Sequence, residues 1–131
     1  MKKRGILNAE LMRCIALLGH KDLFMIGDAG MPIPEGVKVI DLAVCSGVPL
    51  FNQGFDAVVD ETEIEYYYVA EETAVKNPKL GEHIRQGLPG IEQESMSHEE
   101  LKKKSAECRF AIRTGEFSPY ANVILRAGVV F

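Results

Sequence analysis

The chain has only three histidines, and two of them lie where a histidine can do chemistry. His20 directly follows Gly19, and His98 follows Ser97 at the start of a predicted helix. Imidazole exchanges a proton near neutral pH, so a positioned histidine serves as a general acid or base. The third, His83, falls in the middle of a predicted helix and is expected to face solvent. We therefore take His20 and His98 as the candidate acid–base groups.

Two loop segments supply further polar groups. The segment 26–34, IGDAGMPIP, places Asp28 at the end of a predicted strand, where ligands bind in α/β sheets. The segment 113–122, RTGEFSPYAN, carries Tyr120 and Asn122, whose side chains point to the same side if the segment is extended. Carboxylate, imidazole, phenol and amide groups together both donate and accept hydrogen bonds. This set is suited to acid–base chemistry on a polyhydroxylated ligand.

Each of these residues also has a purely structural interpretation. His20 can cap the negative end of the preceding helix, and Asp28 can serve as a turn residue beside a glycine. His98 can be an exposed residue at a helix start. Tyr120 and Asn122 can be a satisfied polar pair where a strand begins. The residue types alone leave both interpretations open.

Several other chemistries lack their sequence motifs. The chain contains no GxxxxGK[ST], GxGxxG, GxSxG or HExxH pattern, so nucleotide, dinucleotide, serine-hydrolase and zinc-protease functions have no support. The histidines and aspartates show no paired spacing typical of metal ligands. We therefore expect neither a metal nor a cofactor.

Composition and charge are typical of a single globular domain covering residues 1–131. The chain is 47% hydrophobic and 26% charged, with a net charge of −4, and its apolar content leaves room for a subunit interface. The short basic runs 2–4 and 102–104 are typical of solvated faces. A nucleic acid is therefore not an expected partner.

The three cysteines, Cys14, Cys45 and Cys108, are widely spaced and form no CxxC pattern. We expect them to be reduced and mostly buried. The basic start of the chain precedes no apolar stretch of signal-peptide length, and no later segment approaches a membrane span. The sequence therefore predicts a cytoplasmic location without membrane contact.

The hydrophobic pattern predicts helices separated by short strands. Asn8 is expected to cap a first helix that ends at Gly19, with Leu7 packed against its start. Ser97 and Glu100 form a capping-box pattern for a short helix that ends near Cys108. The remaining segments are a weak helical or irregular stretch at 55–60 and a longer helix at 71–86 that Pro78 interrupts.

Short apolar or β-branched runs predict the strands. Their expected ranges are 23–26, 37–42, 64–69, 91–96, 110–113, 122–125 and the terminal 129–131. Strands that alternate with helices indicate an α/β domain with three layers, in which helices flank a mixed sheet of about six strands.

Several segments carry a resemblance to a known family. The segments are 5–8 (GILN), 18–20 (LGH), 28–34 (DAGMPIP), 40–42 (IDL), 97–100 (SHEE) and 113–122 (RTGEFSPYAN). Together they resemble the ribose pyranase and fucose mutarotase family across essentially the whole chain. The DAGxPxP loop and the C-terminal motif are the most specific parts, and the middle, from about Asn52 to Glu94, is the weaker part. Lys21 and Gly27 depart from the residues expected beside the histidine and the aspartate.

The resemblance implies a cofactor-free enzyme, an isomerase that interconverts pyranose and furanose forms of D-ribose by opening and closing the sugar ring. It would serve a pathway whose transporter and kinase handle different ring forms. In that family the residue matching His20 is the catalytic acid. The matching sugar contacts are Asp28, His98, Tyr120, Ala121 and Asn122, to which we add Lys102 because it lies four residues beyond His98 on the same helix face. Family members assemble into closed rings, commonly homodecamers of two stacked pentamers with the pocket near a subunit boundary, and the resemblance implies such an assembly here.

Other functions remain open. Within the same class, the sugar can be L-fucose or a relative, although the glycine-proline form of the Asp28 loop favours the ribose branch. From other classes, the chain can be a sugar-binding regulatory subunit without turnover or a structural ring-forming protein.

Overall fold

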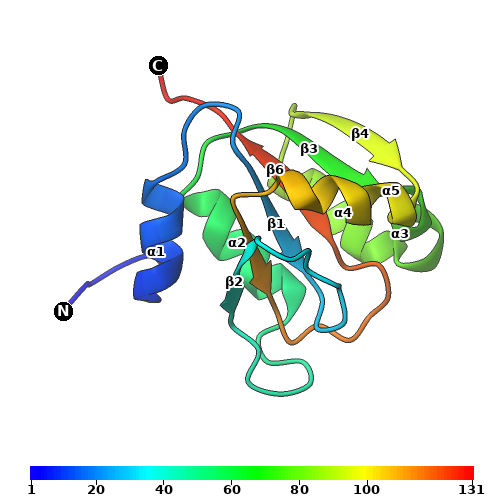
Figure 1. Cartoon of the computed structure of the whole chain (residues 1–131), viewed down its shortest axis with the longest axis horizontal. Coiled ribbons are helices and arrows are strands. Elements are labelled where there is room, and N and C mark those ends of the chain that lie inside the picture. The colour runs from blue at the N-terminus through cyan, green and yellow to red at the C-terminus, as the bar shows by residue number, and fades with distance from the viewer.

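Six strands form one mixed sheet in the order β2-β5-β1-β6-β3-β4 in the structure, a computed structural model that describes all 131 residues (Figure 1). Neighbouring strands are parallel, except that β6 runs antiparallel to β1 and β3. The strands are β1 (Leu23–Gly27), β2 (Lys38–Asp41), β3 (Ile64–Ala70), β4 (Glu92–Met96), β5 (Phe110–Arg113) and β6 (Val123–Ala127). The prediction of a mixed six-stranded sheet is confirmed.

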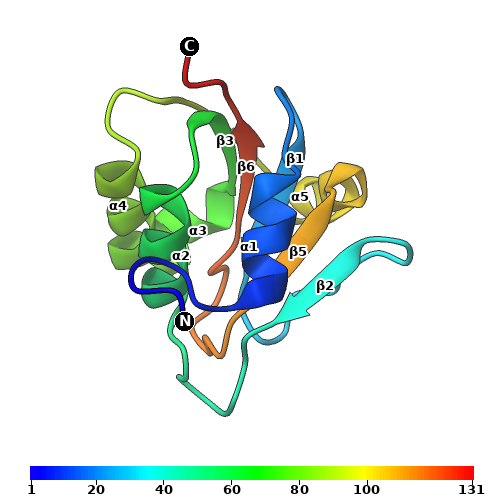
Figure 2. The same ribbon diagram turned by 90° about the vertical axis from the view of Figure 1, so that its left-hand side faces the viewer.

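Helices cover both faces of this sheet. They are α1 (Ala9–Ala16), α2 (Phe51–Asp60), α3 (Glu71–Lys76), α4 (Pro78–Gly87) and α5 (His98–Lys104), which continues into the 3-10 turn η1 (Ser105–Glu107). Figure 2 shows α2 and α4 on one side of the sheet and α5 on the other. None of these helices has the length and apolar character needed to cross a membrane.

Alternation along β1 explains the three layers. Phe24 and Ile26 point into a core shared with α1, α2 and α4, whereas Leu23 and Met25 point into a second core against α5. Successive side chains of a strand face opposite sides, so a run that is apolar throughout needs cover on both sides. All five residues of β1 are buried, which makes it the central strand of the domain.

The first helix is shorter than predicted. Asn8 caps it as expected by accepting a hydrogen bond from the Leu11 N–H at 2.9 Å, but the helix ends at Ala16 rather than Gly19. The Leu18 N–H already bonds to the carbonyl three residues back, which tightens the final turn. Leu7 remains 65% exposed and does not pack against the helix start.

Two further expectations need correction. The terminal segment 129–131 forms no strand, because the ladder of β6 ends at Ala127 and the three residues that follow Gly128 are exposed. The weak helical or irregular stretch expected at 55–60 is a helix that begins already at Phe51, where the side chain of Gln53 accepts the Leu50 N–H and Phe51 stacks on Phe55 in the core. Burial of those two rings stabilises a helix that propensity alone does not predict.

The cysteines are all free: Cys14 and Cys108 are buried as expected, and Cys45 is exposed.

Candidate active site

The carboxyl edge of the sheet gathers most of the predicted polar groups. The parallel strands β1, β2 and β5 all end there, and the reversed strand β6 begins there. Asp28 follows β1 directly, and Asn122 immediately precedes β6. Ligands of α/β sheets bind beyond this edge because loops, not packed strands, form its surface.

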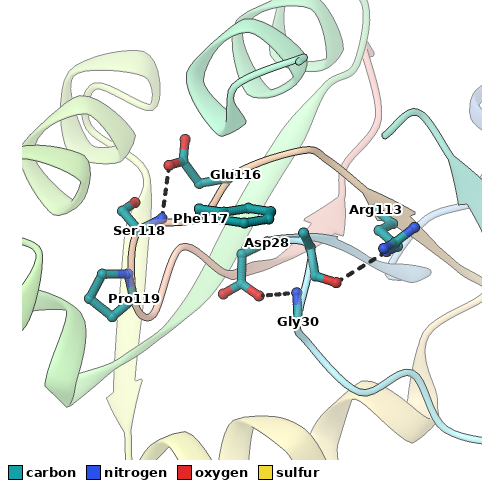
Figure 3. Close-up of a pocket in the computed structure, with 8 residues that line it drawn as sticks. Asp28, Gly30, Arg113, Glu116, Phe117, Ser118 and Pro119 are labelled. Atoms are coloured by element: carbon teal, nitrogen blue, oxygen red, sulfur yellow. Dashed lines mark hydrogen bonds between the residues drawn. The ribbon is translucent and has the colours of Figure 1, made fainter. Parts of the chain in front are cut away.

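A cavity of about 410 Å³ opens at this edge (Figure 3). Its wall comes from the loop after β1 and the loop after β5, two segments far apart in the sequence. The lining residues are Asp28, Ala29, Gly30, Arg113, Glu116, Phe117, Ser118 and Pro119. Three of them carry charged side chains, so the cavity is a polar one that Phe117 lines with an aromatic ring.

Asp28 and Asn122 hold each other across this edge. The Asn122 amide Nδ2 donates to Oδ2 of Asp28 at 3.0 Å, and its Oδ1 accepts the Asp28 backbone N–H at 3.1 Å. The other carboxylate oxygen, Oδ1, accepts the Gly30 N–H at 2.9 Å. Asp28 lines the cavity, and the fully buried Asn122 holds its carboxylate from the side facing away from the cavity.

Arg113 ties the two loops together. Its Nε donates to the carbonyl oxygen of Ala29 at 3.2 Å, and its NH1 pairs with Oδ2 of Asp41 at 2.8 Å. Figure 3 shows the guanidinium at the side of the cavity opposite Pro119. The arginine therefore holds the loop that presents Asp28.

Glu116 anchors the other wall. Its carboxylate accepts the backbone N–H groups of Ser118 at 3.0 Å and Phe51 at 3.1 Å, and its carbonyl accepts the Ala29 N–H at 2.9 Å. Burial acts to raise the pKa of this carboxyl group, but the N–H donors of Ser118 and Phe51 outweigh it, so the pKa is lowered. Glu116 thus stays ionised and joins the cavity wall to the start of α2.

His98 and Tyr120 form a second polar group beside the Pro119 end of the cavity. Their rings meet edge to face with centroids 5.0 Å apart. The backbone N–H of His98 donates to Glu72, and the hydroxyl of Thr73 donates to the carbonyl of Tyr120. The Nδ1 atom of His98 is buried and has no hydrogen-bond partner within the chain.

The backbone at Tyr120 differs from the extended geometry considered for the C-terminal motif. Its φ of 55° is left-handed, so Tyr120 and Asn122 do not share a face: Tyr120 meets His98, and Asn122 meets Asp28. Ala121 between them is fully buried in the core and can offer a ligand only its backbone. Lys102 lies on α5 with His98 and pairs with Glu99 at 2.8 Å.

His20 lies at the opposite edge of the sheet. The next residue, Lys21, donates its N–H to the carbonyl of Ala127 at the far end of β6. Since β1 and β6 each have five residues at about 3.3 Å per residue, roughly 16 Å of strand separates the two edges. Within one copy of the chain, His20 and Asp28 therefore do not share a cavity.

The partner of His20 within the chain is Glu65. The Nε2 atom of His20 lies 2.9 Å from Oε2 of Glu65, whose other oxygen lies 2.8 Å from Nε of Arg126. The hydrogen bond to His20 is the largest cause of a lowered pKa for Glu65. Within the chain, Glu65 contacts the imidazole of His20, and Asp28 does not.

His83, expected to face solvent, is 31% exposed at its side chain and pairs with Asp56 at 2.6 Å.

The structure has no group of three or more His, Cys, Asp or Glu side chains placed to hold a metal ion.

The sequence alone predicts no role for Arg113, Glu116 or Glu65. The first two lie inside the C-terminal motif already singled out, so the motif was the available signal. Glu65 had none, because it lies in a tyrosine-rich strand and reaches His20 only in three dimensions.

A three-layer α/β domain with a polar cavity at the carboxyl edge defines a protein that handles a small polar molecule. Residues 1–130 match the RbsD / FucU transport protein family, and the chain belongs to that family. The resemblance found in the sequence motifs is thereby confirmed.

Relatives of this chain match it over its full length. It is 46% identical to the D-ribose pyranase of Lactiplantibacillus plantarum and 48% identical to that of Limosilactobacillus fermentum, over 100% of each chain. The structure of Bacillus subtilis RbsD complexed with D-ribose is 42% identical, with a TM-score of 0.96 over 100% of both chains. A fucose mutarotase of Streptococcus pneumoniae in complex with L-fucose shares the fold, with a TM-score of 0.81 and 23% identity over 95% of each chain.

Proposed function

We propose that this chain is a cofactor-free isomerase that interconverts the pyranose and furanose forms of D-ribose. Full-length relatives at 44–48% identity carry the name D-ribose pyranase, and the Bacillus subtilis relative binds D-ribose. The observation that carries the proposal is the polar cavity at the carboxyl edge, where Asn122 holds the Asp28 carboxylate. Beside it, the buried Nδ1 of His98 lacks a partner.

The reaction opens and closes a C–O bond with the help of proton transfers and involves no oxidation or reduction. Ring opening breaks the bond between C1 and the ring oxygen while the anomeric hydroxyl becomes the carbonyl of the open aldehyde. The anomeric hydroxyl loses a proton and the ring oxygen gains one, so the number of protons is unchanged. Closure through a different hydroxyl reverses both transfers and yields the other ring size. One positioned acid–base group contributes about 10²- to 10⁴-fold to such a step.

We assign the acid role to His20. The sugar contacts are then the Asp28 carboxylate, a ring nitrogen of His98 and the Tyr120 hydroxyl, while the buried Asn122 amide serves the sugar by holding the Asp28 carboxylate from behind. Ala121 contributes its backbone. Lys102, four residues beyond His98 on α5, contributes a cation at the same helix face. Sugar hydroxyls both donate and accept, and this mixture of groups satisfies both directions.

The position of His20 makes assembly part of the proposal. Because His20 and Asp28 lie at opposite edges of the sheet, His20 reaches the sugar only from a neighbouring copy. We therefore propose a homo-oligomer in which the sites lie between subunits, with two stacked pentameric rings as the expected form. The free cysteines support a cytoplasmic place for this assembly.

L-fucose is the second candidate substrate. The relative with bound L-fucose is only 23% identical, whereas the relative with bound D-ribose is 42% identical over the full chain. That difference favours D-ribose.

Exchange NMR on equilibrated D-ribose tests the function directly. A mutarotase accelerates the exchange between ring forms, whereas a sugar-binding regulatory subunit leaves the spontaneous rate unchanged and a structural protein binds no sugar. We expect His20→Ala to abolish the acceleration with an unchanged urea midpoint. A fully active variant would show that His20 is not the acid.

Mixing two inactive variants tests the site between subunits. His20→Ala and Asp28→Asn, refolded together, are expected to regain roughly a quarter of the wild-type rate, because one interface in four then joins an intact His20 to an intact Asp28. Each variant refolded alone is the control. No recovery in the mixture would place both residues in a site within a single subunit and contradict the proposal.

A further inference from the structure

The loop that carries His20 is closed by a backbone hydrogen bond between its ends, and further backbone hydrogen bonds join it to β6. The Asp22 N–H donates to the carbonyl of Gly19 at 3.1 Å, which closes a four-residue turn around His20 and Lys21. Lys21 has a φ of 70°, the left-handed geometry that the third position of a type II turn requires. The carbonyl of Asp22 accepts the Ala127 N–H at 2.9 Å. The backbone of His20 is therefore fixed relative to β6.

Its imidazole is 49% exposed, so the backbone turn alone does not fix the ring. The contact that does is the 2.9 Å hydrogen bond between Nε2 and the Glu65 carboxylate. Glu65 is itself only 27% exposed and therefore has less freedom than a surface carboxylate.

A bulge in β3 aims Glu65 at this position. Ile64 lies opposite Ala127 and Tyr66 lies opposite Arg126, so Glu65 is an extra residue without a partner on β6. Ile64 and Tyr67, three residues apart, consequently pack in the same core, although regular alternation would put them on opposite faces. Bulges redirect a single side chain and are enriched next to active sites.

Arg126 holds the other side of the carboxylate. Its Nε lies 2.8 Å from Oε1 of Glu65 as an ion pair, without the alignment of a hydrogen bond, and its guanidinium stacks over the Tyr66 ring at 4.6 Å. Each oxygen of Glu65 thus has one cationic or N–H partner. With Arg126 at Oε1, the Oε2 atom of Glu65 is free to accept a hydrogen bond from the imidazole N–H of His20.

We propose that Glu65 is the positioning residue for His20: it accepts the Nε2–H bond and so leaves Nδ1 as the nitrogen that exchanges a proton with the sugar. This inference rests on the function proposed above. A carboxylate in this position fixes both the tautomer and the orientation of an imidazole. Asp28 does not serve this purpose within the chain, because its carboxylate oxygens accept from Asn122 and Gly30.

The protons balance without any transfer to or from Glu65. In ring opening, Nδ1 of protonated His20 gives its proton to the ring oxygen as the bond to C1 breaks, while water takes the proton of the anomeric hydroxyl. In closure, Nδ1 takes the proton of the attacking hydroxyl, and water returns one to the anomeric oxygen. The Nε2–H bond to Glu65 stays in place throughout.

Glu65→Ala and Glu65→Gln in the full-length protein separate the two contributions of the carboxylate. The alanine removes the acceptor, whereas the glutamine keeps an oxygen acceptor without the charge. We expect Glu65→Ala to lower kcat about 10- to 100-fold with KM within about threefold of wild type, and Glu65→Gln to recover part of the loss. Wild-type kcat in Glu65→Ala would overturn the proposal.

Asp56→Asn is the matched control. Asp56 pairs with the imidazole of His83 at 2.6 Å, as Glu65 pairs with that of His20. The variant therefore removes the same kind of carboxylate partner from a different histidine. It is expected to leave kcat unchanged.

NMR of protein with ¹⁵N-labelled histidine gives a readout that does not depend on activity. We expect a slowly exchanging Nε2–H signal that is lost in His20→Ala and Glu65→Ala and is kept in Glu65→Gln and Asp56→Asn. Persistence of that signal in Glu65→Ala would overturn the proposed contact. If the wild-type protein did not accelerate ribose exchange, the proposed function would be wrong, while this signal would still decide whether Glu65 holds His20.

Discussion

Asn122 and Asp28 join the start of β6 to the end of β1 through two hydrogen bonds in opposite directions. One uses the backbone N–H of Asp28 and the other its carboxylate, so the amide of Asn122 is satisfied on both of its atoms. Because Asn122 is fully buried, this pair both connects the two strands and holds in place the carboxylate that lines the cavity.

Asn122→Asp tests this pair without changing its shape. The new carboxylate faces that of Asp28 in place of a donor, so we expect the free energy of unfolding at pH 7 to fall by about 2–3 kcal/mol and ribose turnover to be lost. At about pH 4 a proton shared by the two carboxyl groups restores the hydrogen bond, because two carboxylates in contact raise the pKa of one of them, so the penalty shrinks. Urea unfolding at both pH values measures it.

Asn8→Asp is the control for that variant. It makes the same substitution at a helix cap where a carboxylate serves as well as an amide, so stability is expected to stay within about 0.5 kcal/mol of wild type. Equal losses in both variants would contradict the importance of the Asp28 pair.

Gly27→Ala tests the space behind the same pair. An added Cβ would lie 2.8 Å from Oδ1 of Asn122 and 3.2 Å from Cβ of Met31. We expect it to displace the amide, to cost about 1–3 kcal/mol of stability and to raise the KM for ribose. Gly81→Ala in α4, where the nearest side-chain atom is 3.7 Å away, is expected to be neutral or stabilising. An unchanged KM in Gly27→Ala would show that the site tolerates movement of Asn122.

Ser97→Ala tests the helix that carries His98. The Ser97 hydroxyl accepts the Glu100 N–H at 3.2 Å, and the Glu100 carboxylate accepts the Ser97 N–H at 3.0 Å. Removal of one half of this capping box is expected to cost about 1 kcal/mol and to raise KM, because α5 has only seven residues. Ser97→Thr keeps the hydroxyl and should retain both properties in the same urea and exchange measurements.

Glu116→Gln tests the cavity wall through its pH dependence. The lowered pKa of Glu116 means that its ionised form stabilises the fold fully above the ordinary range of a glutamate, and that this contribution is lost as pH falls through the lowered value. The glutamine offers one acceptor to two N–H donors, so we expect about 1–3 kcal/mol less stability at neutral pH and a flatter decline in acid. Urea unfolding at several pH values checks both.

Glu107→Gln provides the comparison for that pH series. Glu107 is 62% exposed and pairs with Lys104 at 3.4 Å, and such surface pairs contribute little. A decline in acid for Glu116→Gln as steep as in this variant would contradict the role of Glu116.

Much of the fold follows from local pattern. The Asn8 cap, the capping box at Ser97 and the uniformly apolar run of β1 each depend on near neighbours in the sequence, and each appears in the structure as predicted. The start of α2 at Phe51 was missed because two buried rings from the core, rather than helix propensity, stabilise it. The strand expected at 129–131 is absent since no neighbouring strand continues beside it.

The site was predictable only in part. The two separate motifs that contain Asp28 and Asn122 indicated both residues as site candidates, but not that they bind each other. The left-handed backbone of Tyr120 turned its side chain to His98, and a bulge turned Glu65 to His20. Both depend on backbone geometry that side-chain alternation cannot express.

The placement of His20 and Asp28 at opposite ends of β1 has a consequence for symmetry. If a working site takes one residue from each of two neighbours, every copy offers a donor half at one end and an acceptor half at the other. A head-to-tail row of copies then leaves one idle half at each terminus, whereas a closed circle leaves none. The geometry of a single strand thus favours closed over open, linear arrangements.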